Sequence, residues 1–215
     1  MRKEIFYRIL QLTLIPLFLS FVKRVDGLDN VPKSNSFVVV ANHTSYIDPF
    51  IIRSVFHKYL DKVIFYLVKK EIYNNRLIKW FLDSCGGIPV DRLKDGRIGL
   101  NSALGILKEG KAVGIFPEGT RSHDGKLHNG KTGAARLALF ARCPILPIGI
   151  QNTFELWPRH NKIPKLKKSV VVKVGKSFTL EKYYKKRITN RLLHNITDEI
   201  MLRISKLSGQ EYVKD

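Results

Sequence analysis

Two short segments hold the side chains of this sequence that can do acid–base chemistry on a substrate. Residues 42–48 read NHTSYID and place His43 five positions before Asp48. A histidine can take up a proton near neutral pH, and a carboxylate bonded to one ring nitrogen leaves the other nitrogen free to accept it. The segment is therefore a candidate general base with an orienting partner.

The second segment, residues 116–122, reads FPEGTRS and has the composition of an anion-binding loop. Gly119 permits a tight turn, and the planar guanidinium of Arg121 can hold a phosphate through two parallel hydrogen bonds. The simpler alternative is a surface turn closed by a local salt bridge.

The first segment also has a purely structural alternative. Ser45 is followed three residues later by Asp48, which is the spacing of a helix capping box. The two interpretations are compatible, because a carboxylate has two oxygens and can serve the helix terminus and the histidine together.

Both segments follow apolar runs, residues 37–41 and 112–116, whose composition predicts buried strands. Further strands are expected at residues 63–68, 88–90, 145–150 and 169–174, the last at an edge of the sheet. Helices are expected at residues 47–60, 74–84, 96–107, 132–142 and 189–207. Strands that alternate with helices predict an α/β fold, with a largely parallel mixed sheet flanked by helices on both sides. In such a sheet the site forms at the carboxyl ends of the strands, where both segments lie.

Two more segments accompany this pair, GGIPVDR at residues 86–92 and CPILPIGI at residues 143–150. In the order in which they follow one another along the chain, the four segments resemble those of the glycerolipid acyltransferases of the 1-acyl-glycerol-3-phosphate (lysophosphatidic acid) acyltransferase type. The resemblance implies an O-acyltransferase that moves an acyl chain from acyl-CoA or acyl-carrier protein to the free hydroxyl of 1-acyl-glycerol-3-phosphate. The product would be phosphatidic acid for phospholipid synthesis. It also implies His43 as general base oriented by Asp48, with no acyl-enzyme and no cofactor beyond the co-substrate. No metal is expected, because the six histidines show no metal-ligand spacing.

The same resemblance assigns the substrate-binding residues, which are Arg92, Glu118, Gly119, Thr120 and Arg121. In the family the FPEGTRS block holds the glycerol-phosphate of the acceptor, and Arg92 would be a second phosphate contact. Within the block, the resemblance implies that Glu118 positions Arg121 or a substrate hydroxyl group rather than contacting the phosphate. Lys69 and Lys70 resemble a family segment near the active site, so one of them is a candidate for contacting the donor or polarising the thioester carbonyl. A surface position without such a role stays open for Arg92 and for both lysines.

The charge of the chain favours anionic partners. Its 215 residues carry 38 Lys and Arg against 18 Asp and Glu, a net charge of +20, and the 44% hydrophobic content is typical of a folded domain. Twelve basic residues lie between Arg159 and Arg191, where Glu181 is the only acid. Such a field attracts an anionic membrane or nucleic acid. We favour the membrane, because no recognisable nucleic-acid-binding module accompanies the patch. A solvated basic face is the simpler alternative.

Residues 9–22 are almost wholly apolar and are bracketed by basic residues. The run is shorter than the roughly 20 residues of a bilayer span and contains Pro16. We therefore expect residues 1–30 to form a membrane-anchoring helix that lies in the interface, and residues 31–215 to form the acyltransferase domain. The expected location is the cytoplasmic face of the inner membrane, as a peripheral or monotopic protein. A membrane span and a core helix remain alternatives.

Two other functions remain open from the sequence. The acceptor can be another lysolipid, such as a lyso-ornithine lipid or a lysophospholipid with a larger head group. A protein of another class, a non-catalytic basic module that binds membranes or nucleic acid, would need neither the pair His43 and Asp48 nor a phosphate-binding loop.

Overall fold

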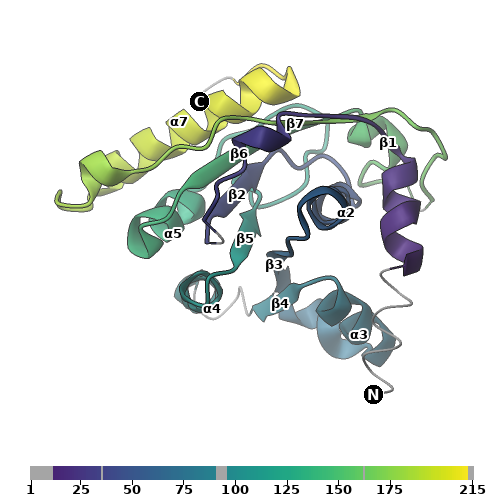
Figure 1. The fold of residues 1–215 in the computed structure, drawn as a ribbon, viewed down its shortest axis with the longest axis horizontal. Helices are drawn as coiled ribbons and strands as arrows, with labels where there is room; N and C mark the ends of the chain where they lie inside the picture. The colour runs from purple at the N-terminus through teal and green to yellow at the C-terminus, as the bar shows by residue number, and fades with distance from the viewer. Residues whose placement is uncertain (1–11, 35, 91–95, 162, 213–215) are drawn as a thin grey trace.

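The computed structural model describes residues 12–34, 36–90, 96–161 and 163–212 (Figure 1). In this part of the chain seven strands form one sheet, in the order β1-β7-β6-β2-β5-β3-β4. The strands are β1 (Val22–Asp26), β2 (Val38–Ala41), β3 (Ile64–Lys69), β4 (Gly87–Val90), β5 (Ala112–Ile115), β6 (Ile145–Gln151) and β7 (Val170–Val174). Neighbouring strands are parallel except β6 and β7, which are antiparallel. The predicted α/β class with a largely parallel sheet is confirmed.

Helices cover both faces of this sheet, as predicted. They are α2 (Asp48–Leu60), α3 (Arg76–Ser84), α4 (Gly96–Lys108), α5 (Gly133–Ala141), α6 (Thr153–Leu156) and α7 (Asn190–Ser208), with a further helical stretch at residues 12–20. One face is covered by α2 and residues 12–20, and the other by α4, α5 and α7 (Figure 1). None of the described helices is long and apolar enough to cross a membrane.

The apolar run of β2 fills both layers of the core. Val39 and Ala41 belong to the cluster on the α2 side, whereas Val38 and Val40 belong to the cluster under α4, α5 and α7. Successive side chains of a strand point to opposite faces, so a strand that is covered on both sides needs an uninterrupted apolar run. This requirement explains why the sequence pattern located the strand correctly.

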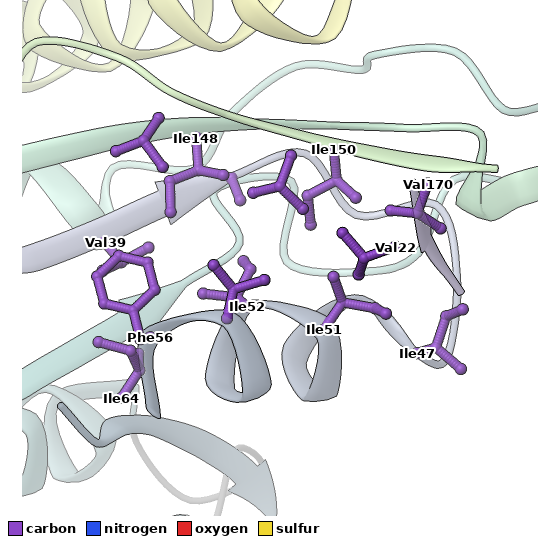
Figure 2. Packing of buried hydrophobic residues seen from close by; sticks show 14 of the residues in the cluster. Val22, Val39, Ile47, Ile51, Ile52, Phe56, Ile64, Ile148, Ile150 and Val170 are labelled. Atoms are coloured by element: carbon purple, nitrogen blue, oxygen red, sulfur yellow. The ribbon is translucent and has the colours of Figure 1, made fainter. Parts of the chain in front are cut away.

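Figure 2 shows the layer between α2 and the sheet. Ile52 and Phe56 on α2 point toward Val39 on β2 and Ile148 on β6, and all four side chains are buried. Each large aliphatic or aromatic side chain removed from water contributes roughly 1.5–3 kcal/mol. This packing holds α2 against β2 and β6 and so fixes the position of its first residue, Asp48.

The N-terminal segment differs from the prediction. The chain is helical over residues 12–20, and residues 22–26 form β1, which pairs in parallel with β7. The predicted edge position of residues 169–174 is wrong, because β1 lies outside β7. β1 also falls within the residues 1–30 expected to form one anchoring helix, so this part of the segment folds with the sheet. Its sequence, VKRVD, is charged at three of five positions and gives no apolar strand signal.

Candidate active site

The two predicted segments leave the sheet side by side. β2 and β5 are adjacent and parallel, with Val40 opposite Ile115, so both chains turn away from the same edge. Hydrogen bonds then join the loops: the N–H of Ser122 donates to the carbonyl of His43 over 2.8 Å, and the N–H of His43 donates to Oε1 of Glu118 over 2.7 Å. The structure therefore brings the histidine segment and the arginine segment into one site.

His43 and Asp48 form the predicted pair. Nδ1 of His43 lies 2.8 Å from Oδ2 of Asp48, and the same oxygen accepts the N–H groups of Thr44 at 2.8 Å and Ser45 at 2.7 Å. The side chain of Asp48 is completely buried, whereas that of His43 is 17% exposed. Because an ionised carboxylate only accepts hydrogen bonds, Nδ1 is assigned as the donor and Nε2 as the free acceptor. A proton can therefore be taken up at Nε2.

The capping-box alternative holds in part. Asp48 accepts the N–H of Ser45, as the third residue of such a box does, but the hydroxyl of Ser45 donates to the carbonyl of Trp157 over 2.7 Å. The residue at the N-cap of α2 is Ile47, which makes no side-chain cap. A single oxygen of Asp48, Oδ2, thus bonds both the backbone that leads into α2 and the imidazole. The sequence had suggested that each task would use its own oxygen.

A stack of rings supports the imidazole from the side. The ring of His43 lies 4.0 Å from that of Phe116 at an angle of 17°, and Phe116 in turn stacks on Tyr66 at 5.5 Å and 13°. Tyr66 on β3 faces Gly114 on β5, where any Cβ would overlap its ring. A glycine at this position therefore makes room for the stack, which fixes the plane of the imidazole.

A buried tyrosine hydroxyl, that of Tyr66, was not predicted from the sequence. The hydroxyl of Tyr66 and Oδ1 of Asp48 are both buried, and neither has a hydrogen-bond partner within the described structure. Burial raises the pKa of Tyr66 well above its usual value, and the nearby carboxylate of Asp48 raises it further. Tyr66 therefore stays neutral, and it adds no charge next to Asp48.

Glu118 does not bind Arg121, which was one of the two roles expected for it from the sequence. Its Oε1 accepts the N–H of His43, and its Oε2 accepts the N–H of His128 at 3.2 Å, so the carboxylate holds backbone rather than Arg121. Burial raises its pKa from about 4.5 to about 7, although the two backbone donors oppose this shift. Glu118 is thus the link that ties the FPEGTRS loop to the backbone of the general-base candidate.

Arg121 is held by an aromatic ring. The guanidinium carbon lies 3.5 Å from the ring centroid of Tyr46, and that ring packs at 5.3 Å against Trp157. One guanidinium nitrogen, Nη1, is buried and has no hydrogen-bond partner among the residues that the structure describes. The arginine therefore has at least one donor that no described group satisfies.

The remaining predicted residues lie around this edge. Gly119 has φ = 73°, in the left-handed region that glycine adopts without strain, and Thr120 is exposed. Lys69 ends β3, which is parallel to β5 and so ends at the same edge, and Lys70 follows it in an exposed turn. Within the described residues no hydrogen bond or ion pair joins Lys70 to His43 or Asp48. Arg92 lies outside the described residues.

Several supporting residues were not predicted. The side chain of Asn42 exchanges two hydrogen bonds of 2.8 Å with the backbone of Ile150, and the hydroxyls of Thr44 and Thr153 lie 2.9 Å apart. The two pairs fasten the NHTSYID segment to the end of β6 and to the start of α6. Their only sequence signal was their place beside the histidine, because the partners lie more than 100 positions away.

Fold and site together define a class of protein. An imidazole is oriented by a buried carboxylate at the carboxyl ends of parallel strands, and the neighbouring loop carries an arginine with an unsatisfied donor. This arrangement suits activation of a hydroxyl group on an anionic substrate. The comparisons agree with this class: the family model described as Acyltransferase matches residues 23–151, more than half of the chain. The chain belongs to the acyltransferase family.

Three relatives illustrate the sequence similarity. The 1-acyl-sn-glycerol-3-phosphate acyltransferase of Bacillus subtilis is 34% identical over 130 residues, which are 60% of this chain and 62% of that protein. The Borreliella burgdorferi enzyme of the same name is 32% identical over 65% of this chain and 55% of its own length. The chloroplastic LPAT1 of Arabidopsis thaliana is 33% identical over 62% and 37%. The matches thus span less than two thirds of each relative.

A solved structure supports the fold. The 1-acyl-sn-glycerophosphate acyltransferase PlsC from Thermotoga maritima superposes with a TM-score of 0.72 and covers 99% of this chain and 83% of that one. At 23% sequence identity, this structural likeness supports the fold alone.

Proposed function

We propose that this protein is an O-acyltransferase that esterifies 1-acyl-glycerol-3-phosphate, with acyl-CoA or acyl-carrier protein as donor. The observation that carries the proposal is the contact of 2.8 Å between Nδ1 of His43 and Oδ2 of Asp48, which leaves Nε2 free to accept a proton. The backbone hydrogen bond from Ser122 to His43 brings the loop of Arg121 alongside this pair. The relatives in Bacillus, Borreliella and Arabidopsis are named as 1-acyl-sn-glycerol-3-phosphate acyltransferases, which supports the choice of acceptor.

The proposed reaction is a direct transfer. Nε2 of His43 takes the hydroxyl proton of the acceptor as its oxygen bonds to the thioester carbonyl carbon. The tetrahedral oxyanion that results then collapses, the C–S bond breaks, and the imidazolium returns the proton to the thiolate that leaves. Asp48 stabilises the imidazolium through Nδ1 and does not itself change protonation. No serine or cysteine carries the acyl group, so the donor and the acceptor must be bound together.

Arg121 is assigned to the acceptor phosphate, and Glu118, Gly119 and Thr120 shape the loop that presents it. Arg92, as a second phosphate contact, and Lys69 or Lys70, near the donor carbonyl, complete the proposal as predicted from the sequence. A phosphate contact also favours a phosphorylated acceptor over a lyso-ornithine lipid, which has no phosphate for Arg121 to bind.

The proposal includes an anionic membrane as partner, at the cytoplasmic face of the inner membrane. Residues 12–20 expose Leu12 and Leu17, which are 73% and 48% accessible, next to a chain of strongly positive charge. A Leu12→Asp, Leu17→Asp variant should sediment less with anionic vesicles than the wild type. Leu202→Asp on α7, where the leucine is 50% exposed, is the matched control and should bind normally. An equal loss of vesicle binding in both variants would argue against a membrane anchor at residues 12–20.

The test of catalysis uses purified protein, 1-acyl-glycerol-3-phosphate and either donor, with phosphatidic acid as the measured product. His43→Ala should lower turnover by about 10²- to 10⁴-fold, the usual contribution of a general base. A panel of lysolipid head groups with both donors then ranks the acceptors. If His43→Ala turned over as fast as the wild type, the mechanism would be wrong. If the wild type showed no turnover on any lysolipid while still binding vesicles, the non-catalytic class would be favoured.

A further inference from the structure

We propose that Tyr46 is a positioning residue that aims the guanidinium of Arg121 and thereby selects acceptors with a phosphate head group. The inference rests on the proposed function, because it assumes that Arg121 binds the acceptor phosphate. It adds a residue that the sequence motifs do not assign. Tyr46 lies inside NHTSYID, three positions after His43 and two before Asp48, so the same segment would carry the base and orient the phosphate contact.

The first support is the geometry of the stack. The guanidinium carbon of Arg121 lies 3.5 Å from the ring centroid of Tyr46. A guanidinium carries all its N–H donors in its plane, so an aromatic ring on its face holds the cation without using any donor. A carboxylate partner would have occupied two of these donors. The stack therefore holds Arg121 in place and leaves its in-plane donors for a ligand.

The second support is what surrounds the arginine. Within the described chain no carboxylate forms an ion pair with Arg121, and the acid of the same loop, Glu118, is bonded to backbone N–H groups. Nη1 of Arg121 is buried without a hydrogen-bond partner there. A buried charged donor without a partner is unfavourable. An anionic ligand that reaches Nη1 removes this penalty, and a neutral head group does so less well.

The third support is the way in which Tyr46 itself is held. Its ring packs at 5.3 Å against Trp157, whose indole N–H donates to the carbonyl of Asn161 over 3.0 Å. The carbonyl of Trp157 accepts the hydroxyl hydrogen of Ser45, the neighbour of Tyr46, at 2.7 Å. The ring thus lies between the loop that follows α6 and the guanidinium. Such a backing keeps the arginine in one orientation before the ligand arrives, which lowers the entropy lost on binding.

The experiment compares Tyr46→Phe with Tyr46→Leu, together with Arg121→Ala and the double variant Tyr46→Leu, Arg121→Ala. Tyr46→Phe keeps the ring, and Tyr46→Leu keeps apolar bulk without a π face. We expect Tyr46→Phe to behave like the wild type. Tyr46→Leu should raise the acceptor KM about 2- to 30-fold, the range of a cation–π contact, with little change in the donor KM. It should have no further effect once Arg121 is alanine.

A second measurement does not depend on turnover. Binding of glycerol 3-phosphate to the full chain, followed by calorimetry, should weaken in Tyr46→Leu and not in Tyr46→Phe. Melting temperatures check that each variant is folded, and Tyr46→Met replaces Tyr46→Leu if the latter unfolds. Three results would overturn the role of Tyr46. The first is the same acceptor KM in Tyr46→Phe and Tyr46→Leu, and the second is an equal rise of the acceptor KM and the donor KM in Tyr46→Leu. The third is an effect of Tyr46→Leu that persists unchanged once Arg121 is alanine. If Arg121→Ala alone left the acceptor KM unchanged, the phosphate assignment of the proposed function would fail instead.

Discussion

The two functional groups of the site lie on neighbouring loops but are held in opposite ways. Asp48 is completely buried and accepts three hydrogen bonds on one oxygen, one of them from the imidazole that also stacks on Phe116. Arg121 rests on the face of Tyr46 and keeps a buried donor unpaired within the described structure. The first group must have one fixed orientation before a substrate arrives. The second must retain donors that a ligand can satisfy.

This difference predicts how each group responds to substitution. A change on the His43 side should lower turnover while binding survives, since it removes an interaction that strengthens in the transition state. A change on the Arg121 side should raise the KM of one substrate, since it removes binding that begins in the ground state. Glu118 connects the two sides, so its substitution should act on the stability of the whole arrangement.

The largest expected effect is that of Asp48→Asn. The amide cannot stabilise an imidazolium, and its NH₂ group can donate to Nδ1, which would place the ring proton on Nε2 and block the acceptor position. Turnover should fall by about 10²- to 10⁴-fold, with the acceptor KM little changed. Steady-state kinetics with both substrates provide the measurement. A variant that lost acceptor binding and kept its turnover would show that Asp48 serves binding, the role given above to Arg121.

The sequence was sufficient for much of the fold because buried parallel strands require apolar runs. Residues 37–41 and 112–116 were located within a residue or two of β2 and β5. The charged strand β1 was missed, and with it the internal position of β7, because pairing at an edge depends on a neighbour rather than on composition. The partners of a parallel strand are also set by long-range topology, which no local pattern records.

The site shows the same limit. The pairing of His43 with Asp48 followed from spacing, because His43 lies on the short turn that leads into α2 and Asp48 is the first residue of that helix. The partner of Glu118 did not follow, since which donor reaches its carboxylate depends on how two loops cross after leaving different strands. The contact of Tyr46 with Arg121 joins residues 75 positions apart and needs that same crossing.

The next effect in size concerns Glu118, the link between the loops. Its pKa is about 7 in the folded protein and near 4.5 when it is exposed, so between these values the folded state binds the extra proton. The contribution of this group to stability is therefore full below pH 4.5 and is lost as the pH rises through 7. At about 1.4 kcal/mol per pH unit, the free energy of unfolding should fall by roughly 2 kcal/mol between pH 5 and 7.5 on account of this group.

Glu118→Gln should remove this pH dependence. The variant should also be less stable than the wild type at pH 5, because its NH₂ group would face one of the two backbone donors, whereas both oxygens of the protonated carboxyl group can still accept. Urea unfolding of both proteins at pH 5 and 7.5 measures the two free energies. A stability difference between wild type and variant that did not shrink toward pH 7.5 would show that Glu118 is ionised throughout.

The smallest expected effect is that of Arg121→Lys, and it tests the recognition side most finely. Lysine keeps the positive charge but presents a compact ammonium, which cannot offer two parallel donors and stacks less well on Tyr46. If the phosphate is held by a fork, the acceptor KM should rise about 10-fold, as expected when one charge-assisted hydrogen bond is lost. The donor KM and the turnover number should stay near their wild-type values. The matched variant Arg203→Lys on α7, where the arginine stacks on Phe178 at 4.0 Å and pairs with Glu199, should leave all three unchanged. An acceptor KM unaffected by Arg121→Lys but raised by Arg121→Ala would mean that charge alone attracts the head group. The open donors and the stacked geometry would then have no part in choosing it. A fall in turnover without a change in KM would place Arg121 with His43 and Asp48, among the groups that act on the transition state.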